Sequence, residues 1–436
     1  MTHPPALTFS TKMIVRTLEH GQLVIDRFYA IWKNQIQQGK IPFGWIATDT
    51  ETAARAGWGE NDALVIGRTQ MRVFSMCFQG ESYCFVTSAF DPDCPLPSEW
   101  LDLFKPLLLD RSVVKVFHNA NYDLNVFWTE GMAYVRNIYC TMIGVWKANA
   151  SLEKSLKDRA PLYGRHLGSL HISKEMRKLG FVSVSEQDLQ DYAAYAEEDV
   201  IATDEIFQTQ IFGSFVRNAK IGHINARARL EFSANPMPAG TVKLTEETLT
   251  MRDRLEIQFQ ELPYLRATIR AEQRGFPFNR GRLQKIRRKL TEDIDNALRK
   301  VFQLAGSSFN MNSQPQMAEL FERLGIESPD RTKKGKPSFK AAALFKIKDS
   351  HPVIAAITTY KELQKLQSVY VGDPSAENAQ KKLGLEYYAL EDGLIRASAN
   401  TVGAVTGRGS SSNPNLTQIP SAKDIYGIKD CFTPTR

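Results

Sequence analysis

Short runs rich in β-branched and aromatic residues alternate with amphipathic helical runs between Phe43 and about Phe215. The β-type runs are G-W-I-A-T-D, M-R-V-F-S-M-C-F, Y-C-F-V-T and V-V-K-V-F-H, and the amphipathic runs follow them. Because β-type and helical segments that alternate in this way build a sheet covered by helices, the pattern predicts an α/β domain with a mixed sheet.

Acidic residues stand where these apolar runs meet polar sequence. Asp49 and Glu51 are two residues apart in W-I-A-T-D-T-E-T, so on a strand they point the same way. Asp123 follows V-V-K-V-F-H, and Asp199 lies four residues after Tyr195 in a stretch whose apolar spacing predicts a helix with both on one face. Hard divalent cations prefer oxygen ligands, so the set predicts a metal-dependent phosphodiesterase site.

The composition narrows the cellular setting. Fifty-five Lys and Arg against 48 Asp and Glu give a formal charge of +7, which is compatible with nucleic acid. The five cysteines form no C-x-x-C pair, and no apolar run reaches the length of a membrane span. We therefore expect a reduced, cytoplasmic protein without a membrane partner. An organellar transit peptide is the lesser alternative, since the first eighteen residues lack acids but are poor in Ser and Arg.

The acidic segments in this order, with Tyr-x-x-x-Asp on a helix, resemble the tyrosine branch of the DEDD superfamily of 3′–5′ exonucleases. The resemblance implies an α/β ribonuclease H-like (DnaQ-like) domain over residues 43–215. It also implies two Mg²⁺ ions, for which Mn²⁺ can substitute. Asp49 would bridge the ions, Glu51 and Asp199 would bind one, and Asp123 would serve the other through water. Tyr195 would orient the attacking water.

The same resemblance implies contacts to the terminal nucleotide by Thr52 and Asn119. Relatives often carry Asp-Thr where this chain has Cys140-Thr141, but that position is not one of the metal-site acids. Glu197 and Glu198, next to Asp199, are expected to be charges on the helix surface.

The character of the sequence changes after a connector over residues 216–244. Long helical patterns follow, over Thr245–Gln273 with Gly275 as the terminating residue, from a cap at Asn279 to about Leu304, and over Pro352–Tyr370. Ser313 and Ser338 are expected to cap shorter helices.

Two basic clusters lie among these helices. The cluster at 280–289 fits a solvated helix face and a phosphate-tracking face equally well. The cluster at 331–336 contains a glycine between its lysines and precedes Pro337, which predicts an exposed loop tip. We expect that loop to contact phosphates of a duplex through Lys333, Lys334 and Lys336.

The segment T-G-R-G-S-S-S-N-P-N-L-T-Q-I-P at 406–420 resembles a motif of the family A (polymerase I-like) DNA polymerases. Further matches occur in the family's order, at A-E-Q-R-G, F-N-M-N-S-Q-P-Q, T-K-K-G-K-P-S and Y-K-E-L-Q-K-L-Q-S-V-Y. The resemblance implies a mainly helical thumb over 245–384 and an incomplete α+β palm over 385–436, after an extension at 1–42. The implied DNA contacts are Arg408, Asn415 and Gln418.

The family's Asp-Tyr-Ser-x-x-Glu motif does not occur before Arg436. The expectation is therefore the N-terminal part of a family A DNA polymerase, of a phage type that would act in the host cytoplasm. It would carry proofreading 3′–5′ exonuclease activity, while polymerisation would need a missing C-terminal part such as a separate polypeptide. The strands of the partial palm are expected to lack sheet partners.

The expected partners are a single-stranded DNA 3′ end and a primer–template duplex. Two other functions stay open: a stand-alone exonuclease of the ribonuclease D type, against which the T-G-R block argues, and a non-catalytic DNA-binding scaffold, against which the intact acid set argues.

Overall fold

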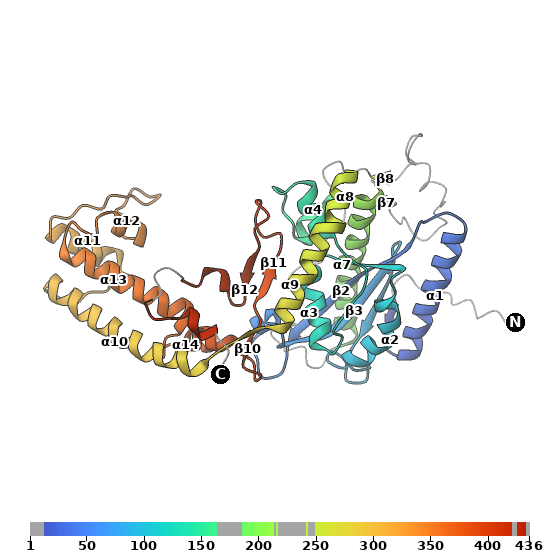
Figure 1. The fold of residues 1–436 in the computed structure, drawn as a ribbon, viewed down its shortest axis with the longest axis horizontal. Helices are drawn as coiled ribbons and strands as arrows, with labels where there is room; N and C mark the ends of the chain where they lie inside the picture. Colours follow the sequence, from blue (N-terminus) through green and yellow to red (C-terminus); the bar gives the residue numbers. More distant parts are fainter. Residues whose placement is uncertain are drawn as a thin grey trace. The chain divides into compact units, whose positions relative to one another are not determined.

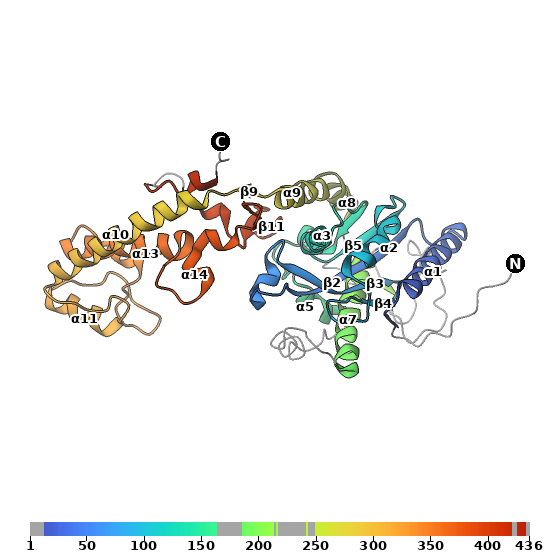
Figure 2. The same ribbon diagram turned by 90° about the horizontal axis from the view of Figure 1, so that it is seen from below.

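A computed structural model describes the chain over most of its length, and its contacts form two compact units (Figures 1 and 2). Unit 1 comprises residues 1–274 and 396–413, and unit 2 comprises residues 275–395 and 414–436. The described residues are 13–163, 185–212, 215–216, 241–242, 249–420 and 425–432. The predicted connector at 216–244 lies mostly outside them.

Unit 1 is built on a six-stranded sheet in the order β1-β4-β3-β2-β5-β6. Strands β2, β3 and β4 are antiparallel neighbours, whereas β5 runs parallel to β2, β6 parallel to β5, and β1 parallel to β4. The predicted mixed sheet is thus confirmed. The strand bounds are β1 Met13–Val15, β2 Gly44–Ala54, β3 Thr69–Phe78, β4 Glu81–Val86, β5 Val113–Phe117 and β6 Ile138–Cys140.

The hairpin between β3 and β4 has a two-residue loop, Gln79 and Gly80, in which both residues have positive φ (54° and 82°). Positive φ at both loop positions belongs to the tight turn whose twist matches that of paired strands. The turn therefore fixes the register of β3 against β4.

Helices cover both faces of the sheet, with α2 and α3 on one and α7 on the other (Figure 2). Trp45 of β2 donates from its indole N–H to Asp204 of α7 (2.7 Å), while Thr50 of the same strand contacts Asp123 of α3. Odd and even positions of β2 thus face different helices, as strand geometry requires. The helix bounds are α1 Leu18–Gln37, α2 Pro97–Leu109, α3 Ala120–Thr129, α4 Thr141–Ala148, α5 Leu156–Arg159 and α7 Glu186–Phe212.

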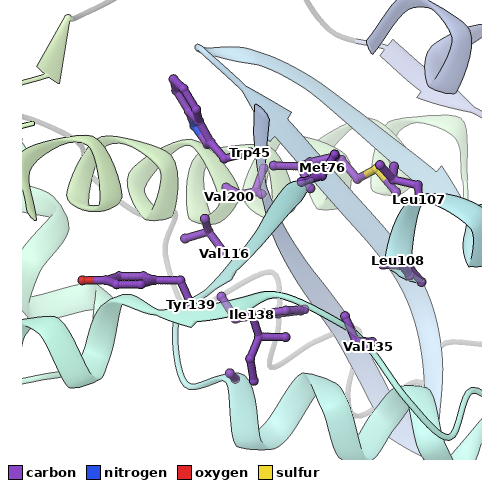
Figure 3. Packing of buried hydrophobic residues seen from close by; sticks show 14 of the residues in the cluster. Trp45, Met76, Leu107, Leu108, Val116, Val135, Ile138, Tyr139 and Val200 are labelled. Atoms are coloured by element: carbon purple, nitrogen blue, oxygen red, sulfur yellow. The ribbon is translucent and has the colours of Figure 1, made fainter. Parts of the chain in front are cut away.

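Apolar side chains from these strands and helices fill the interior of unit 1 (Figure 3). Trp45, Val116 and Val200 are fully buried, and they come from β2, β5 and α7. Because strands and helices from distant parts of the chain share this core, the ends of β2, α3 and α7 are held in fixed positions.

Unit 1 also contains a long helical segment after residue 249. It consists of α8 (Met251–Glu256), a π-helical turn η5 (Ile257–Glu261) and α9 (Leu262–Arg274). The predicted helix over Thr245–Gln273 is confirmed from Met251 onward, and residues 243–248 lie outside the described ones. Gly275, with φ of 72°, terminates it as predicted. A hairpin of β11 (Ser398–Asn400) and β12 (Ser410–Ser412) completes unit 1.

Unit 2 is mainly helical, as predicted for a thumb, and its core joins Val301, Met317, Leu320, Val353 and Ile357. Asn279 caps α10 by accepting a hydrogen bond from the Arg282 N–H (2.9 Å). The helical segments are α10 Arg280–Ala305, α11 Gln314–Arg323, α12 Ala341–Lys346, α13 Pro352–Leu366, the π-helical η6 Gln367–Val371, α14 Ala379–Leu383, and the 3₁₀ segments η7 Gly384–Tyr388, η8 Leu416–Gln418 and η9 Lys429–Phe432.

Three local expectations need correction. Ser313 precedes α11 but makes no capping hydrogen bond, and α12 begins after Lys340, so Ser338 does not cap it. Ser338 is instead buried, and its carbonyl accepts a hydrogen bond from Ser328. The predicted palm strands do have partners, because β10 (Leu394–Ile395) pairs with β9 (Phe276–Pro277) and β11 pairs with β12.

Candidate metal centre

Strand β2 presents Asp49 and Glu51 on the face of the sheet that α7 covers. Thr50 between them points to the opposite face, toward α3. A register irregularity against β3 follows directly, between Glu51 and Thr52. Such irregularities re-aim side chains beside functional sites, so the end of β2 is locally adapted.

Helix α7 supplies the third carboxylate. Asp49, Glu51 and Asp199 each offer one oxygen, and these three oxygens lie within 4.8 Å of one another. Asp199 is buried, and its Oδ1 has no hydrogen-bond partner among the described residues. A buried carboxylate oxygen without a donor is costly unless a cation satisfies it, so this donor set fits a divalent metal ion.

Asp123 lies on α3 at the edge of this cluster and is only 2% exposed. Its Oδ1 accepts hydrogen bonds from the Thr50 N–H (3.0 Å) and the Thr50 hydroxyl (2.7 Å). The structure therefore brings three of the predicted acids together and ties the fourth to the strand that carries two of them.

Packing carboxylates this closely makes each harder to ionise. Burial raises the pKa of Asp49 to about 6 and, together with the Asp49 charge, raises the pKa of Asp199 to about 8. Burial also raises the pKa of Glu51, and the charges of Asp49, Asp199 and Asp123 add to the effect. Like charges in a desolvated site disfavour ionisation, and a bound cation reverses that preference.

Tyr195 stands beside the cluster, as the i, i+4 spacing predicts. Burial and the nearby carboxylates raise the pKa of its phenol far above the ordinary value, so the phenol stays protonated. The neighbouring Tyr195 phenol partly offsets the rise in the pKa of Asp199.

Lys157 of α5 is a cation at this site that sequence reasoning missed. Its ammonium lies 5.7 Å from the centre of the Tyr195 ring, and its charge lowers the pKa of Glu51 and of Asp199. Nearby, His118 at the end of β5 hydrogen-bonds through Nε2 to the Lys154 carbonyl (2.7 Å), which ties this segment to the sheet. The polar run around Lys157 has no motif or periodicity that would have singled it out.

Thr52 and Asn119, the predicted contacts to the terminal nucleotide, lie next to β2 residue Glu51 and at the start of α3, respectively. The Thr52 hydroxyl hydrogen-bonds the Tyr122 hydroxyl, and Asn119 precedes α3 with a left-handed backbone (φ 69°). A cavity of about 240 Å³ opens here within unit 1. Amide and hydroxyl side chains line much of it, among them Asn119, Asn121, Asn125, Asn400, Ser412 and Asn413.

The other predicted DNA contacts lie elsewhere in the fold. Lys333, Lys334 and Lys336 are exposed at a tight loop closed by pairing of Arg331 with Pro337, with Gly335 at φ 75°. The loop tip expected at 331–336 is thus present.

Arg408, Asn415 and Gln418 occupy the segment that resembles the polymerase motif. Arg408 is exposed in the hairpin of unit 1, between β11 and β12. Asn415 precedes η8 in unit 2, and the Gln418 carbonyl accepts a hydrogen bond from Tyr370 (2.5 Å) while the residue stays exposed.

The basic cluster at 280–289 divides into two sets. Arg280 donates to the carbonyls of Ala389 and Leu390. Arg282 and Arg287 form ion pairs, with Asp430 (2.6 Å) and Glu386 (2.9 Å). Lys285, Arg288 and Lys289 are exposed. Only this second set fits either a solvated face or a phosphate-tracking face.

A mixed α/β sheet with acids from one strand and two helices at a single site is compatible with a metal-dependent nuclease. Two family models match the chain. The model described as 3'-5' exonuclease matches residues 29–209, and the model described as DNA polymerase family A matches residues 280–436. The chain therefore joins a 3′–5′ exonuclease domain to part of a family A DNA polymerase domain.

Curated relatives agree with this assignment. The thermostable DNA polymerase I of Thermus thermophilus is 33% identical over 179 residues, covering 40% of this chain and 20% of the relative. DNA polymerase I of Chloroflexus aurantiacus is 26% identical, over 79% of this chain and 33% of the relative. DNA polymerase I of Pseudomonas aeruginosa is also 26% identical, over 91% of this chain and 39% of the relative. The chain thus spans well under half the length of these relatives.

A solved structure shares the fold. It is described as the POL domain of Pol1 from M. smegmatis in complex with DNA primer-template and dNTP. The two align with a TM-score of 0.59 at 18% identity, over 92% of this chain and 57% of the other. Among the described helices, none has the length and apolar character needed to cross a membrane.

Proposed function

We propose that this chain removes nucleotides from the 3′ ends of DNA with two Mg²⁺ ions, as the proofreading part of a family A polymerase. The observation that carries the proposal is the approach of Asp49, Glu51 and Asp199 to within 4.8 Å, with one oxygen of Asp199 lacking a protein donor among the described residues. Mn²⁺, with similar oxygen preference, is expected to substitute.

The acids would divide between the two proposed ions. Asp49 would be shared, Glu51 and Asp199 would hold one ion, and Asp123 would serve the other through water. When bound, the ions lower the pKa of a water molecule and neutralise charge on the leaving oxygen. The water oxygen bonds to phosphorus while the bond to the 3′ oxygen breaks, so a nucleoside 5′-monophosphate leaves.

The remaining residues orient the reactants. The protonated Tyr195 phenol can hold the attacking water without competing for a cation. Lys157 presents a positive charge toward the same space, where a substrate phosphate would lie. Thr52 and Asn119 would contact the terminal nucleotide beside the polar cavity.

DNA beyond the terminal nucleotide would be held by the second half of the chain. Lys333, Lys334 and Lys336 would contact duplex phosphates, and Arg408, Asn415 and Gln418 would contact the primer–template. The proposed domains are the exonuclease at 43–215, the connector at 216–244, the thumb at 245–384 and the partial palm at 385–436. A separate C-terminal polypeptide is the proposed partner for polymerisation.

The test is degradation of 5′-labelled single-stranded DNA by the purified 436-residue chain in Mg²⁺. We expect a ladder shortened from the 3′ end, no activity in Asp49→Ala/Glu51→Ala, and a smaller loss in Tyr195→Phe, which keeps the metal ligands. Equal rates of the double variant and the wild type, after identical purification, would show that the site is misassigned.

The same assay separates the alternatives. Faster degradation of an RNA of the same sequence would favour a ribonuclease D-type enzyme. DNA binding without any cleavage by the wild type would favour a non-catalytic scaffold.

A further inference from the structure

Glu272 of α9 is a buried carboxylate at the centre of a hydrogen-bond cluster in unit 1. Its side chain is 3% exposed and accepts hydrogen bonds from the amide groups of Asn121 (2.8 Å) and Asn125 (2.7 Å). A further hydrogen bond comes from the backbone N–H of Ala399 in β11. One carboxylate therefore joins three segments that are far apart in the sequence.

The two asparagines belong to the helix that carries Asp123. They lie two residues before and two residues after it, which places both on the side of α3 away from the Asp123 side chain. Asp123 is thus held from its own side by Thr50, and its helix is held from the opposite side by Glu272.

Other contacts reinforce the attachment of this face of α3. Gln273 donates to the Leu124 carbonyl (3.4 Å), and the Arg396 guanidinium lies 4.9 Å from the centre of the Trp128 ring. Arg396 also donates to the Gln273 carbonyl (2.9 Å). In both ribbon views α9 runs beside α3 (Figures 1 and 2).

Glu272 lies outside both segments that the family models match, 29–209 and 280–436. Burying a carboxylate is costly unless donors surround it, and here three donors do so. Burial raises its pKa to about 7, and the hydrogen bonds from Ala399, Asn125 and Asn121 limit the rise.

We propose that Glu272 is a positioning residue for the exonuclease reaction, because it fixes α3, and with it Asp123, against α9 and β11. This inference rests on the proposed exonuclease function. It means that the metal centre depends on α9 and on the β11–β12 hairpin, which follow the exonuclease segment in the chain. The same hairpin carries Arg408.

Glu272→Gln is the sharpest perturbation, since it keeps the side-chain shape but turns one acceptor oxygen into a donor amide. That amide then faces another donor, and one attachment of α3 is lost. Changing residues that orient metal ligands typically costs about 10- to 100-fold in metal affinity or activity. Glu272 acts through α3 and not on a ligand directly, so we expect a loss of about tenfold.

An exchange of partners provides the rescue. In Glu272→Gln/Asn125→Asp the carboxylate introduced on α3 can accept a hydrogen bond from the amide introduced on α9. The side-chain oxygen at position 272 still accepts hydrogen bonds from Asn121 and Ala399. The negative charge therefore moves from α9 to α3, and every donor again faces an acceptor. Glu130→Gln is the matched control, because Glu130 follows α3 and bonds Arg55 and the Met71 N–H away from Glu272.

Two readouts are measured on the full chain: the rate on single-stranded DNA as a function of Mg²⁺, and the rise of the unfolding temperature during a Mn²⁺ titration. For Glu272→Gln we expect about tenfold lower kcat and about tenfold weaker half-saturation by either metal, with KM for DNA little changed. The double variant should recover both, and Glu130→Gln should alter the unfolding temperature but not the metal dependence.

A folded Glu272→Gln protein with wild-type metal dependence would overturn the proposal, as would a double variant no better than the single one. If the wild-type chain cleaves no DNA, the proposed function fails, but the Mn²⁺ titration still decides whether Glu272 positions the metal centre.

Discussion

Replacing Asp199 by Asn should stabilise the metal-free protein while abolishing its nuclease activity. The pKa of Asp199 is raised from 3.8 to about 8 by burial and by the Asp49 charge. The folded state therefore holds a proton more tightly than the unfolded state does. The contribution of Asp199 to the free energy of unfolding is therefore fully present below about pH 4, and it is lost as the pH rises toward about 8.

The size of the effect follows from the spacing of the acids. Two unit charges about 4.8 Å apart interact by about 3 kcal/mol at an effective dielectric constant near 20. The full pKa shift from 3.8 to about 8 would correspond to about 6 kcal/mol, which is an upper bound because the neighbouring acids titrate together. We expect Asp199→Asn to raise the free energy of unfolding by about 3 kcal/mol at pH 8, which is about 6 °C in unfolding temperature. At pH 4 the variant and the wild type should be almost equally stable.

The assay is thermal unfolding of wild type and variant in EDTA between pH 4 and pH 8.5, read as the difference between the two proteins at each pH. Excess Mg²⁺ should stabilise the wild type more than the variant. Asp191→Asn, on the same helix but outside the acid cluster, is the control for the effect of the substitution itself. A variant that is equally or less stable than the wild type at pH 8 in EDTA would refute the reasoning.

Two further predictions concern cations. Lys157→Ala should lower kcat about tenfold because a charge facing the substrate phosphate is lost, and it should also lower the Mg²⁺ concentration for half-maximal rate because the acids lose a competing cation. Lys157→Arg should keep both values near wild type, and an unchanged kcat in the alanine variant would mean that Lys157 only faces solvent. Replacing Lys333, Lys334 and Lys336 by Ala should weaken duplex binding for all sequences and reduce the salt slope by about one per lost phosphate contact. An unchanged slope in a filter-binding titration would rule out those contacts.

The sequence was informative where spacing alone fixes geometry. Asp49 and Glu51 share a face because strand residues alternate, and Tyr195 and Asp199 share a face because they are one helical turn apart. Asn279 could be recognised as a cap because its side chain acts on the backbone three residues away. These relations hold within a few residues, so no knowledge of the tertiary fold was needed.

Tertiary relations were not accessible in this way. Glu197 was expected on the surface of α7, but it is 4% exposed, because α7 is covered on more of its circumference than its sequence pattern shows. Lys157 and Glu272 gain their roles from contacts with residues 38 and 151 positions away, to Tyr195 and Asn121. Ser338 resembled a helix cap, yet the turn that ends at Pro337 buries it before α12 begins.

The discontinuous make-up of unit 1 has a consequence during synthesis on the ribosome. The unit needs residues 396–413, but the 121 residues from 275 to 395 are made before them. At about 5–20 residues per second this takes about 6–24 s. During that interval Glu272 lacks the Ala399 N–H as a donor, and Asn121 lacks the Ala399 carbonyl as an acceptor. The nascent exonuclease can collapse early, but its last hydrogen bonds form only when the hairpin emerges.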